Sequence, residues 1–353
     1  MQTTVQRLKQ KFPPTAAWFA AVLLTIAWGG CGSVQQPLFT DTHGAIVWPE
    51  PPEPARIKYL GQLSGEGDLG RRVSGAEAFG RLIFGRKDVG VFKNPRSVAV
   101  DGDRLFVAAG GAAVIHIMDL KTRKYVQFSK LDGDSTLRSP VGIAIVEDNV
   151  YVSDSVLGRV CVFDTAGNYR FAFGHGILQR PSGIAYGRSQ QRLYVVDTKR
   201  HVVDMFDLRG KHLGSLGDQG PKGLRFPTFV SVDRQGRIYV SDTLNYCIQV
   251  FEPDGRFVRS IGEHGNRPGY FAHPSGIATD RSGNIYVTDK HFENVQIFNA
   301  DGQILMALGH EGRGPGEFWL PMGLFIDDRD RIFVADSFNK RIQIFQLLEA
   351  QAR

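Results

Sequence analysis

Short runs of hydrophobic residues, separated by polar turns, recur along most of the chain. Residues 227–262 show the pattern clearly, with runs at 228–232, 237–241, 247–251 and 256–261 that are rich in Val, Ile, Phe or Tyr. The segments between them contain Asp, Asn and Gly, which favour tight turns. The runs are too short for helices and lack a 3.6-residue apolar stripe. Each unit therefore predicts a four-stranded antiparallel meander.

Six such units follow one another at nearly regular spacing. Each opens on a proline, and these are Pro95, Pro140, Pro181, Pro227, Pro274 and Pro321. The prolines are 41–47 residues apart. A lone small sheet cannot bury both of its faces, so a four-stranded unit repeated at this period is typical of a propeller blade. The sequence predicts an all-β fold, a six-bladed β-propeller of four-stranded antiparallel blades.

An aspartate ends the second run of five units. These residues are Asp154, Asp197, Asp242, Asp289 and Asp336. We expect them to cap the following turns by accepting backbone N–H bonds, rather than to form a ring of reactive carboxylates. Blade 1 is irregular, because Ala109 stands at this position and two glycines follow it. Phe226, Phe271 and Phe318 come shortly before opening prolines, and we expect them to pack between blades.

The repeated motifs resemble the NHL repeat. The second runs read LYVVD, IYVSD, IYVTD and IFVAD, and the third runs read CIQVF, VQIF and RIQIF, with D-G turns after several of them. The resemblance covers roughly residues 56–348 and implies a six-bladed propeller. It implies no single activity, because the family includes scaffolds, RNA binders and a few metal-dependent lyases.

The two ends of the repeat region complement each other. Residues 56–63 alternate like the fourth run of a blade, whereas the last unit, residues 321–345, has only three runs. We expect the N-terminal strand to complete the last blade and close the ring, which leaves no unpaired edge there. The propeller is expected over 56–348, with a tail at 349–353. A basic, partly apolar insertion at 64–94 precedes blade 1, and is interpreted as a loop packed over the ring or as a partner-binding flap.

The N-terminus has the features of an export signal. Arg7, Lys9 and Lys11 precede an apolar run at 16–28 that is too short to span a bilayer. Small residues then precede Cys31, which resembles the lipobox of bacterial lipoproteins. Residues 1–30 are therefore interpreted as a lipoprotein-type signal peptide, with Cys31 as the lipidation site and lipid anchor. The residue after Cys31 favours the outer membrane; ordinary secretion or a retained anchor is the alternative.

The segment after the signal and the charge balance limit the partners. Residues 31–55 contain five prolines and are expected to form an extended linker. The formal net charge of +6 includes three basic residues and no acidic residue from 1–30, so the mature chain carries +3. This modest charge, together with export, argues against nucleic acid as a partner. We expect a monomeric propeller with an unknown envelope protein or complex as its partner.

The remaining cysteines do not indicate a disulfide or a metal cluster. Cys161 and Cys247 fall on third strands of blades 2 and 4, which do not touch in a ring of six. A disulfide needs α-carbons within about 7 Å, so two free buried thiols are expected. The chain has no haem-attachment or zinc-type cysteine pattern.

Candidate ligand residues gather in the loops at one end of the predicted blades. The histidines expected there are His175, His201, His264, His273, His291 and His310. Imidazoles around the channel could hold a divalent metal, as in the lyase branch of the family. Their positions differ from blade to blade, however, and long polar loops collect histidine anyway. No cofactor is predicted, and no catalytic residue is assigned.

The favoured function is an envelope-anchored scaffold that binds a protein or another ligand on this face. The alternative is a metal-dependent propeller enzyme, a lyase or hydrolase, with its site at the channel mouth. A third hypothesis is a glycan binder in which Tyr270 and Trp319 stack against sugar rings.

Overall fold

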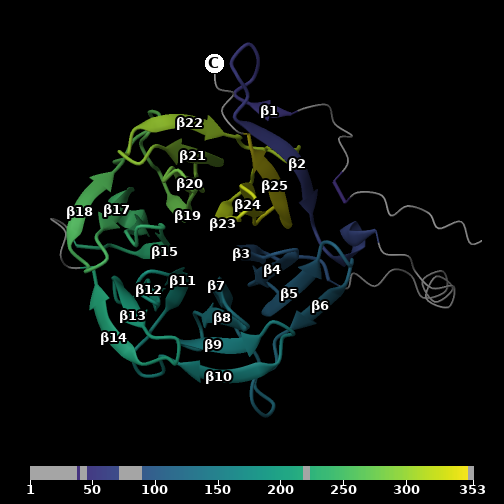
Figure 1. Cartoon of the computed structure of the whole chain (residues 1–353), viewed down its shortest axis with the longest axis vertical. Coiled ribbons are helices and arrows are strands. Elements are labelled where there is room, and N and C mark those ends of the chain that lie inside the picture. The colour runs from purple at the N-terminus through teal and green to yellow at the C-terminus, as the bar shows by residue number, and fades with distance from the viewer. Residues whose placement is uncertain (1–37, 40–45, 71–89, 218–222, 349–353) are drawn as a thin grey trace, which may run out of the picture. The chain divides into compact units, whose positions relative to one another are not determined.

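Six antiparallel β-sheets lie around a common centre (Figure 1). The computed structural model describes residues 38–39, 46–70, 90–217 and 223–348, all of which belong to the compact unit Leu38–Arg353. Besides strands, these residues form two 3-10 helices, η1 (Glu66–Leu69) and η2 (Thr243–Asn245). In each blade the first strand lies nearest the centre, and in the first five blades the fourth strand lies at the periphery (Figure 1). The predicted six-bladed propeller is confirmed.

The first five blades each contain four strands in chain order. Blade 1 comprises β3 (Pro95–Asp101), β4 (Arg104–Ala109), β5 (Val114–Asp119) and β6 (Tyr125–Phe128). Blade 2 comprises β7 (Pro140–Val146), β8 (Asn149–Asp154), β9 (Arg159–Asp164) and β10 (Tyr169–Phe173). Blade 3 comprises β11 (Pro181–Gly187), β12 (Arg192–Asp197), β13 (Val202–Phe206) and β14 (His212–Leu216). Blade 4 comprises β15 (Pro227–Val232), β16 (Ile238–Asp242), β17 (Cys247–Phe251) and β18 (Phe257–Ile261). Blade 5 comprises β19 (Pro274–Thr279), β20 (Ile285–Asp289), β21 (Asn294–Phe298) and β22 (Ile304–Leu308).

Blade 6 is built from both ends of the described chain. Its strands are β23 (Pro321–Ile326), β24 (Arg331–Asp336), β25 (Arg341–Leu347), β2 (Ile57–Leu63) and β1 (Val47–Trp48). β2 pairs antiparallel with β25, so that Ile57 faces Leu347 and Leu63 faces Ile342. The first strands contact one another in sequence from β3 to β23, and β23 contacts β3 again. Closure of the ring by the N-terminal strand is thus confirmed.

The sheet of blade 6 begins earlier than the sequence indicates. Val47 and Trp48 pair with Lys58 and Ile57, although the linker was expected to extend to residue 55. The Trp48 ring lies 5.7 Å from that of Phe345 in an edge-to-face arrangement. The apolar side chain next to the prolines therefore gains buried contacts on the sheet, which favours pairing over an extended spacer.

Several sequence expectations lie outside the described residues. These are the signal peptide at 1–30, Cys31 with the first part of the linker, most of the insertion at 64–94, and the tail at 349–353. At the described ends of the insertion, Leu69 and Phe92 are buried in the apolar cluster that blades 6 and 1 share. No helix within the described ranges is long and apolar enough to cross a membrane.

A buried apolar residue stands three positions before the opening proline of every blade. These residues are Phe92, Leu137, Leu178, Leu224, Phe271 and Phe318. Phe271 and Phe318 pack as expected. Phe226 also lies between blades, with its ring 5.8 Å from the Arg180 guanidinium of blade 3, but it does not enter the core. Phe226 directly precedes Pro227, is only partly buried and has a φ of 58°. Leu224 takes the packing position in that blade, because the offset from the proline decides which side chain enters the core.

Cys161 is a free, buried thiol, as predicted, and Cys247 is buried as well. Burial raises the pKa of the Cys161 thiol to about 12. Since the thiolate is the reactive form, Cys161 is an inert core residue.

Candidate functional site

The loops that precede first strands and those that follow second strands lie at the same end of each blade. Antiparallel pairing places Pro274 opposite Asp289 and Pro321 opposite Asp336. We call this end of the ring the loop face. It contains most of the predicted ligand residues, so its geometry decides what the propeller can bind.

Asp154, Asp197 and Asp289 cap the following turns on the loop face through backbone N–H bonds, as predicted, whereas Asp242 and Asp336 accept side-chain amide bonds from Asn245 and Asn339 there instead. Asp289 accepts N–H bonds from Ala272 and His273 on one side, and from His291 and Phe292 on the other, at 2.8–3.1 Å. Asp154 and Asp197 bridge their two loops in the same way. The carboxylates are fully buried and hold the loops at fixed positions.

The predicted histidines make separate local contacts. His201 Nδ1 accepts a hydrogen bond from the Phe226 backbone N–H at 2.8 Å, and the His264 ring lies 4.3 Å from Tyr246. His310 Nδ1 lies 2.9 Å from the carbonyl oxygen of Glu311, to which it can donate.

His175 and His291 are exposed on blades that do not adjoin each other. Partly buried His273 has its pKa lowered by burial and by the nearby ammonium of Lys290. Within the described parts of the chain, no group of three His, Cys, Asp or Glu side chains is close enough to hold a metal ion. Metal binding by these histidines remains a prediction without geometric support.

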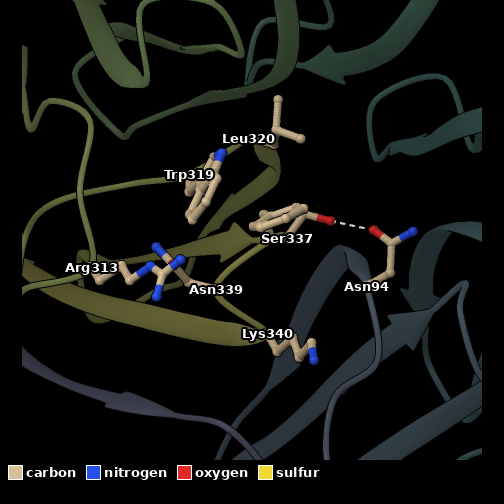
Figure 2. Close-up of a pocket in the computed structure, with 8 residues that line it drawn as sticks. Asn94, Arg313, Trp319, Leu320, Ser337, Asn339 and Lys340 are labelled. Atoms are coloured by element: carbon tan, nitrogen blue, oxygen red, sulfur yellow. Dashed lines mark hydrogen bonds between the residues drawn. The ribbon is translucent and has the colours of Figure 1, made fainter.

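Tyr270 and Trp319 have different surroundings. The Tyr270 hydroxyl donates to the Glu263 carboxylate, which raises the pKa of the phenol, and its ring lies against Gly265. Trp319 instead belongs to a cavity of about 680 Å³ between blades 6 and 1 (Figure 2). Tyr270 does not line this cavity, so the two aromatic residues do not form one binding surface there.

The cavity combines exposed apolar side chains with amides and cations. Its lining residues are Asn94, Arg313, Trp319, Leu320, Ser337, Phe338, Asn339 and Lys340. We call this the Trp319 pocket. The Trp319 and Phe338 rings lie 4.1 Å apart, and the Arg313 guanidinium lies 4.7 Å from the centre of the Trp319 ring. Figure 2 shows Asn94 reaching across from blade 1 toward Ser337, whose hydroxyl donates to the Asn94 side-chain oxygen.

Backbone contacts keep the aromatic pair in place. The Trp319 N–H donates to Asp336 Oδ1 at 2.8 Å, and the Phe338 N–H donates to the Trp319 carbonyl at 3.1 Å. Phe338 nevertheless remains 53% exposed and Leu320 remains 41% exposed. Large apolar side chains held at the surface by a rigid frame are typical of binding sites.

Exposed apolar residues also stand at one repeated position elsewhere on the loop face. Val156 in blade 2 and Leu244 in blade 4 are 66% and 39% exposed, and each lies two residues after the capping aspartate, as Phe338 does in blade 6. None of these three residues was predicted from the sequence as part of a site. Their common offset from the repeated aspartate was the signal that could have found them.

The comparisons with known proteins agree with this architecture. Residues 230–286 and 280–351 match the family model DUF5128, described as a 6-bladed beta-propeller. No curated protein shows a sequence match to the chain. The protein is a six-bladed β-propeller, by its sheet topology and by this match.

Solved structures with the same fold belong to diverse proteins. An auxiliary nutrient binding protein from Bacteroides thetaiotaomicron superposes with a TM-score of 0.59 at 14% identity, over 73% of this chain and 70% of that one. An auxiliary nutrient binding protein from Bacteroides ovatus superposes with a TM-score of 0.59 at 12% identity, over 74% of this chain and 71% of that one. Virginiamycin B lyase from Staphylococcus aureus superposes with a TM-score of 0.55 at 14% identity, over 73% of this chain and 96% of that one. At such identities the likeness shows the fold alone.

Proposed function

We propose that the protein is an NHL-type binding scaffold of the bacterial cell envelope, with the loop face as its binding surface. The observation that carries the proposal is the distribution of exposed apolar side chains. Among the residues that the structure describes, nine large apolar side chains are exposed, and four of them lie on this face: Val156, Leu244, Leu320 and Phe338. Four of the others lie on the outer strands β6, β14, β18 and β22, where a blade edge meets solvent.

The Trp319 pocket is the principal contact in this proposal. Its aromatic pair offers apolar area at low conformational cost, while Asn94 supplies an amide at the rim and Lys340 a cation. Because buried aspartates and backbone bonds fix the surrounding loops, a partner would meet a preorganised surface. The structural neighbours that are described as auxiliary nutrient binding proteins also support a binding function rather than a purely architectural one.

Lipidation at Cys31 would tether this scaffold to the membrane, and the outer membrane is the proposed location. The support is the sequence before Cys31, in which basic residues, an apolar run and small residues follow one another. A tethered propeller can meet a membrane-bound partner repeatedly at high local concentration.

In-cell photo-crosslinking tests the proposed surface. A photo-reactive amino acid replaces Lys340 at the Trp319 pocket in one strain, and Leu213 on the outer strand β14 in another. Both positions are exposed, so the two strains differ in the face that carries the cross-linker and not in its accessibility. We expect a discrete high-mass adduct from position 340 and none from position 213. Identical adduct patterns at the two positions, or an adduct at 213 alone, would contradict the proposal.

A further inference from the structure

Three cationic side chains come from alternate blades to the inner rim of the loop face. Arg96 is the second residue of β3 in blade 1, Arg180 directly precedes β11 in blade 3, and Lys290 directly follows β20 in blade 5. All three positions lie where a first strand begins or a second strand ends, next to the centre of the ring. We call this group the axial cluster.

The members of the axial cluster interact across the centre of the ring. Arg96 repels Arg180, and repels Lys290 as well, although blades 1, 3 and 5 are not neighbours. Burial is the largest cause of the lowered pKa of Arg96, followed by Arg180. Burial and then Arg96 lower the pKa of Lys290 to about 8. Blade 2 separates blades 1 and 3, and blade 6 separates blades 5 and 1, so the direct path between these charges runs inside the ring and not along its circumference.

Protein groups neutralise the axial cluster only partly. Asp154 attracts Arg96 and Asp289 attracts Lys290, but both carboxylates already accept backbone N–H bonds as turn caps. His273 and exposed His291 are the other titratable groups close to Lys290. Among the described residues, none of the three cations forms a salt bridge. The Arg96 guanidinium donates a long bond, 3.5 Å, to Ser139 Oγ, and the Arg180 guanidinium lies 5.8 Å from the centre of the Phe226 ring.

The irregular sequence of blade 1 makes room for Arg96. A side chain at Gly110 would place its Cβ 2.4 Å from Arg96 Nε, so only glycine is compatible with this position of the guanidinium. Ala109 replaces the capping aspartate of the other blades, which leaves Arg96 without a carboxylate from its own blade. These two departures from the repeat therefore leave space for the Arg96 guanidinium and no carboxylate of blade 1 to pair with it.

Blade 5 departs from the repeat in a corresponding way. In blades 3 and 4 the residue after the capping aspartate is Thr198 or Thr243, and its hydroxyl bonds Ser182 or Thr228 at 2.8–2.9 Å. Lys290 occupies this position in blade 5. The facing Ser275 Oγ is consequently fully buried without a hydrogen-bond partner.

The remaining blades contribute apolar side chains to the centre of the ring. Val141 in blade 2, Phe229 in blade 4 and Met322 in blade 6 belong to one hydrophobic cluster, although these blades are not neighbours either. Phe229 also approaches Gly323 of blade 6. Apolar surroundings weaken solvent screening, and so strengthen both the repulsion within the axial cluster and its attraction for an anion.

We propose that the axial cluster is a binding site for a phosphate-type oxyanion, with Arg96, Arg180 and Lys290 donating to its oxygens from three sides and Ser275 Oγ as a further donor. A dianionic tetrahedral group offers acceptors in several directions and replaces mutual repulsion by charge-assisted hydrogen bonds. The group can be free phosphate or the phosphate of a larger ligand. This site does not depend on the proposed function of the Trp319 pocket.

Calorimetric titration of the purified full-length chain with inorganic phosphate tests the site. The buffer contains no phosphate, sulfate or carboxylate, and pH 7 keeps Lys290 protonated. We expect saturable binding of one phosphate per chain, weakened about tenfold or more by Arg96→Met and by Lys290→Thr. Both replacements use residue types that other blades carry at the equivalent positions, Met322 and Thr198. Lys199→Thr, which removes an exposed cation from the same face, is the matched control and should bind as wild type.

Thermal melting provides a second readout. Without phosphate, Arg96→Met and Lys290→Thr should melt at higher temperature than wild type, because each relieves repulsion. Addition of phosphate should raise the melting temperature of the wild type more than that of either variant. Absence of saturable binding to wild type, or equal binding by Lys290→Thr and Lys199→Thr, would overturn the proposal. If full-length wild type binds but a phosphomonoester of comparable charge binds more tightly, the natural ligand is the larger molecule.

Discussion

Arg341 Nε donates to Asp336 Oδ2 at 2.7 Å, and both side chains are almost completely buried. The other guanidinium nitrogens of Arg341 donate to Gln62 Oε1 on the closing strand, and to the carbonyl oxygens of Arg313, Gly314 and Glu317. A single side chain thus joins the capping aspartate of blade 6, the strand that closes the ring and the loop that carries Arg313 of the Trp319 pocket.

Removing this guanidinium should destabilise the fold and loosen the pocket. Arg341→Met leaves Asp336 buried without its charge partner, so we expect a loss of about 3–5 kcal/mol in the free energy of unfolding. Denaturant unfolding measures the loss. The double variant Arg341→Met with Asp336→Asn should recover part of it, because no uncompensated charge remains. A single variant as stable as wild type would show that the pair does not hold the blade together.

Packing of the closing strand should contribute strongly to stability. Ile57 is 1% exposed and belongs to the core of blade 6. We expect Ile57→Ala to reduce the free energy of unfolding by about 2–5 kcal/mol, because it leaves a cavity against β25. Leu213→Ala on the exposed side of β14 is the control and should change it by less than about 0.5 kcal/mol. Equal small effects in the two variants would contradict the role of β2 in closing the ring.

Lys290 predicts a distinct pH dependence of stability. Its pKa is about 8 in the folded protein and 10.5 ordinarily, so between these values the unfolded chain binds more protons. Stability from this group therefore rises from about pH 8 to about pH 10.5 and is lost as pH falls through 8. Chemical unfolding across this range measures the slope. Lys290→Thr should lack this increase in stability with pH. A difference in stability between wild type and variant that is independent of pH would contradict the assignment.

Lipidation predicts a simple fractionation result. Cys31→Ser should release the protein from the membrane fraction into the soluble fraction of the cell envelope, since the acyl chains supply the anchor. Immunoblotting of fractions from the two strains measures the distribution. Variant protein that still requires detergent for extraction would favour an anchor retained in the apolar run at 16–28.

The recurring elements of the fold could be predicted from the sequence, because each blade repeats the same local solution. Period, strand patterning and the turn-capping aspartates agree with one another from blade to blade. The missing fourth run of the last unit indicated closure by residues 56–63. Leu224 was missed, since the more conspicuous Phe226 stands two residues later and only the offset from Pro227 distinguishes them.

The candidate sites consist of residues that depart from the repeat. Such residues are overlooked when the sequence is read for what its repeats share. Arg96, Arg180 and Lys290 stand at three different offsets within their blades and are far apart in the chain. Their proximity follows only from the geometry of the closed ring. The Trp319 pocket likewise joins Asn94 of blade 1 to the last blade. Histidine was the more visible signal in the same loops, but its side chains make separate local contacts.

The central claim is that the loop face, and the Trp319 pocket in particular, holds a partner. The most direct measurement is the native size of the complex extracted from membranes in mild detergent, compared between Phe338→Asp and Leu213→Asp. Both variants place a charge at an exposed apolar position. We predict that Phe338→Asp reduces the wild-type complex to the size of the isolated chain, while Leu213→Asp leaves it intact. A complex that survives Phe338→Asp, or is lost equally in both variants, would contradict the account.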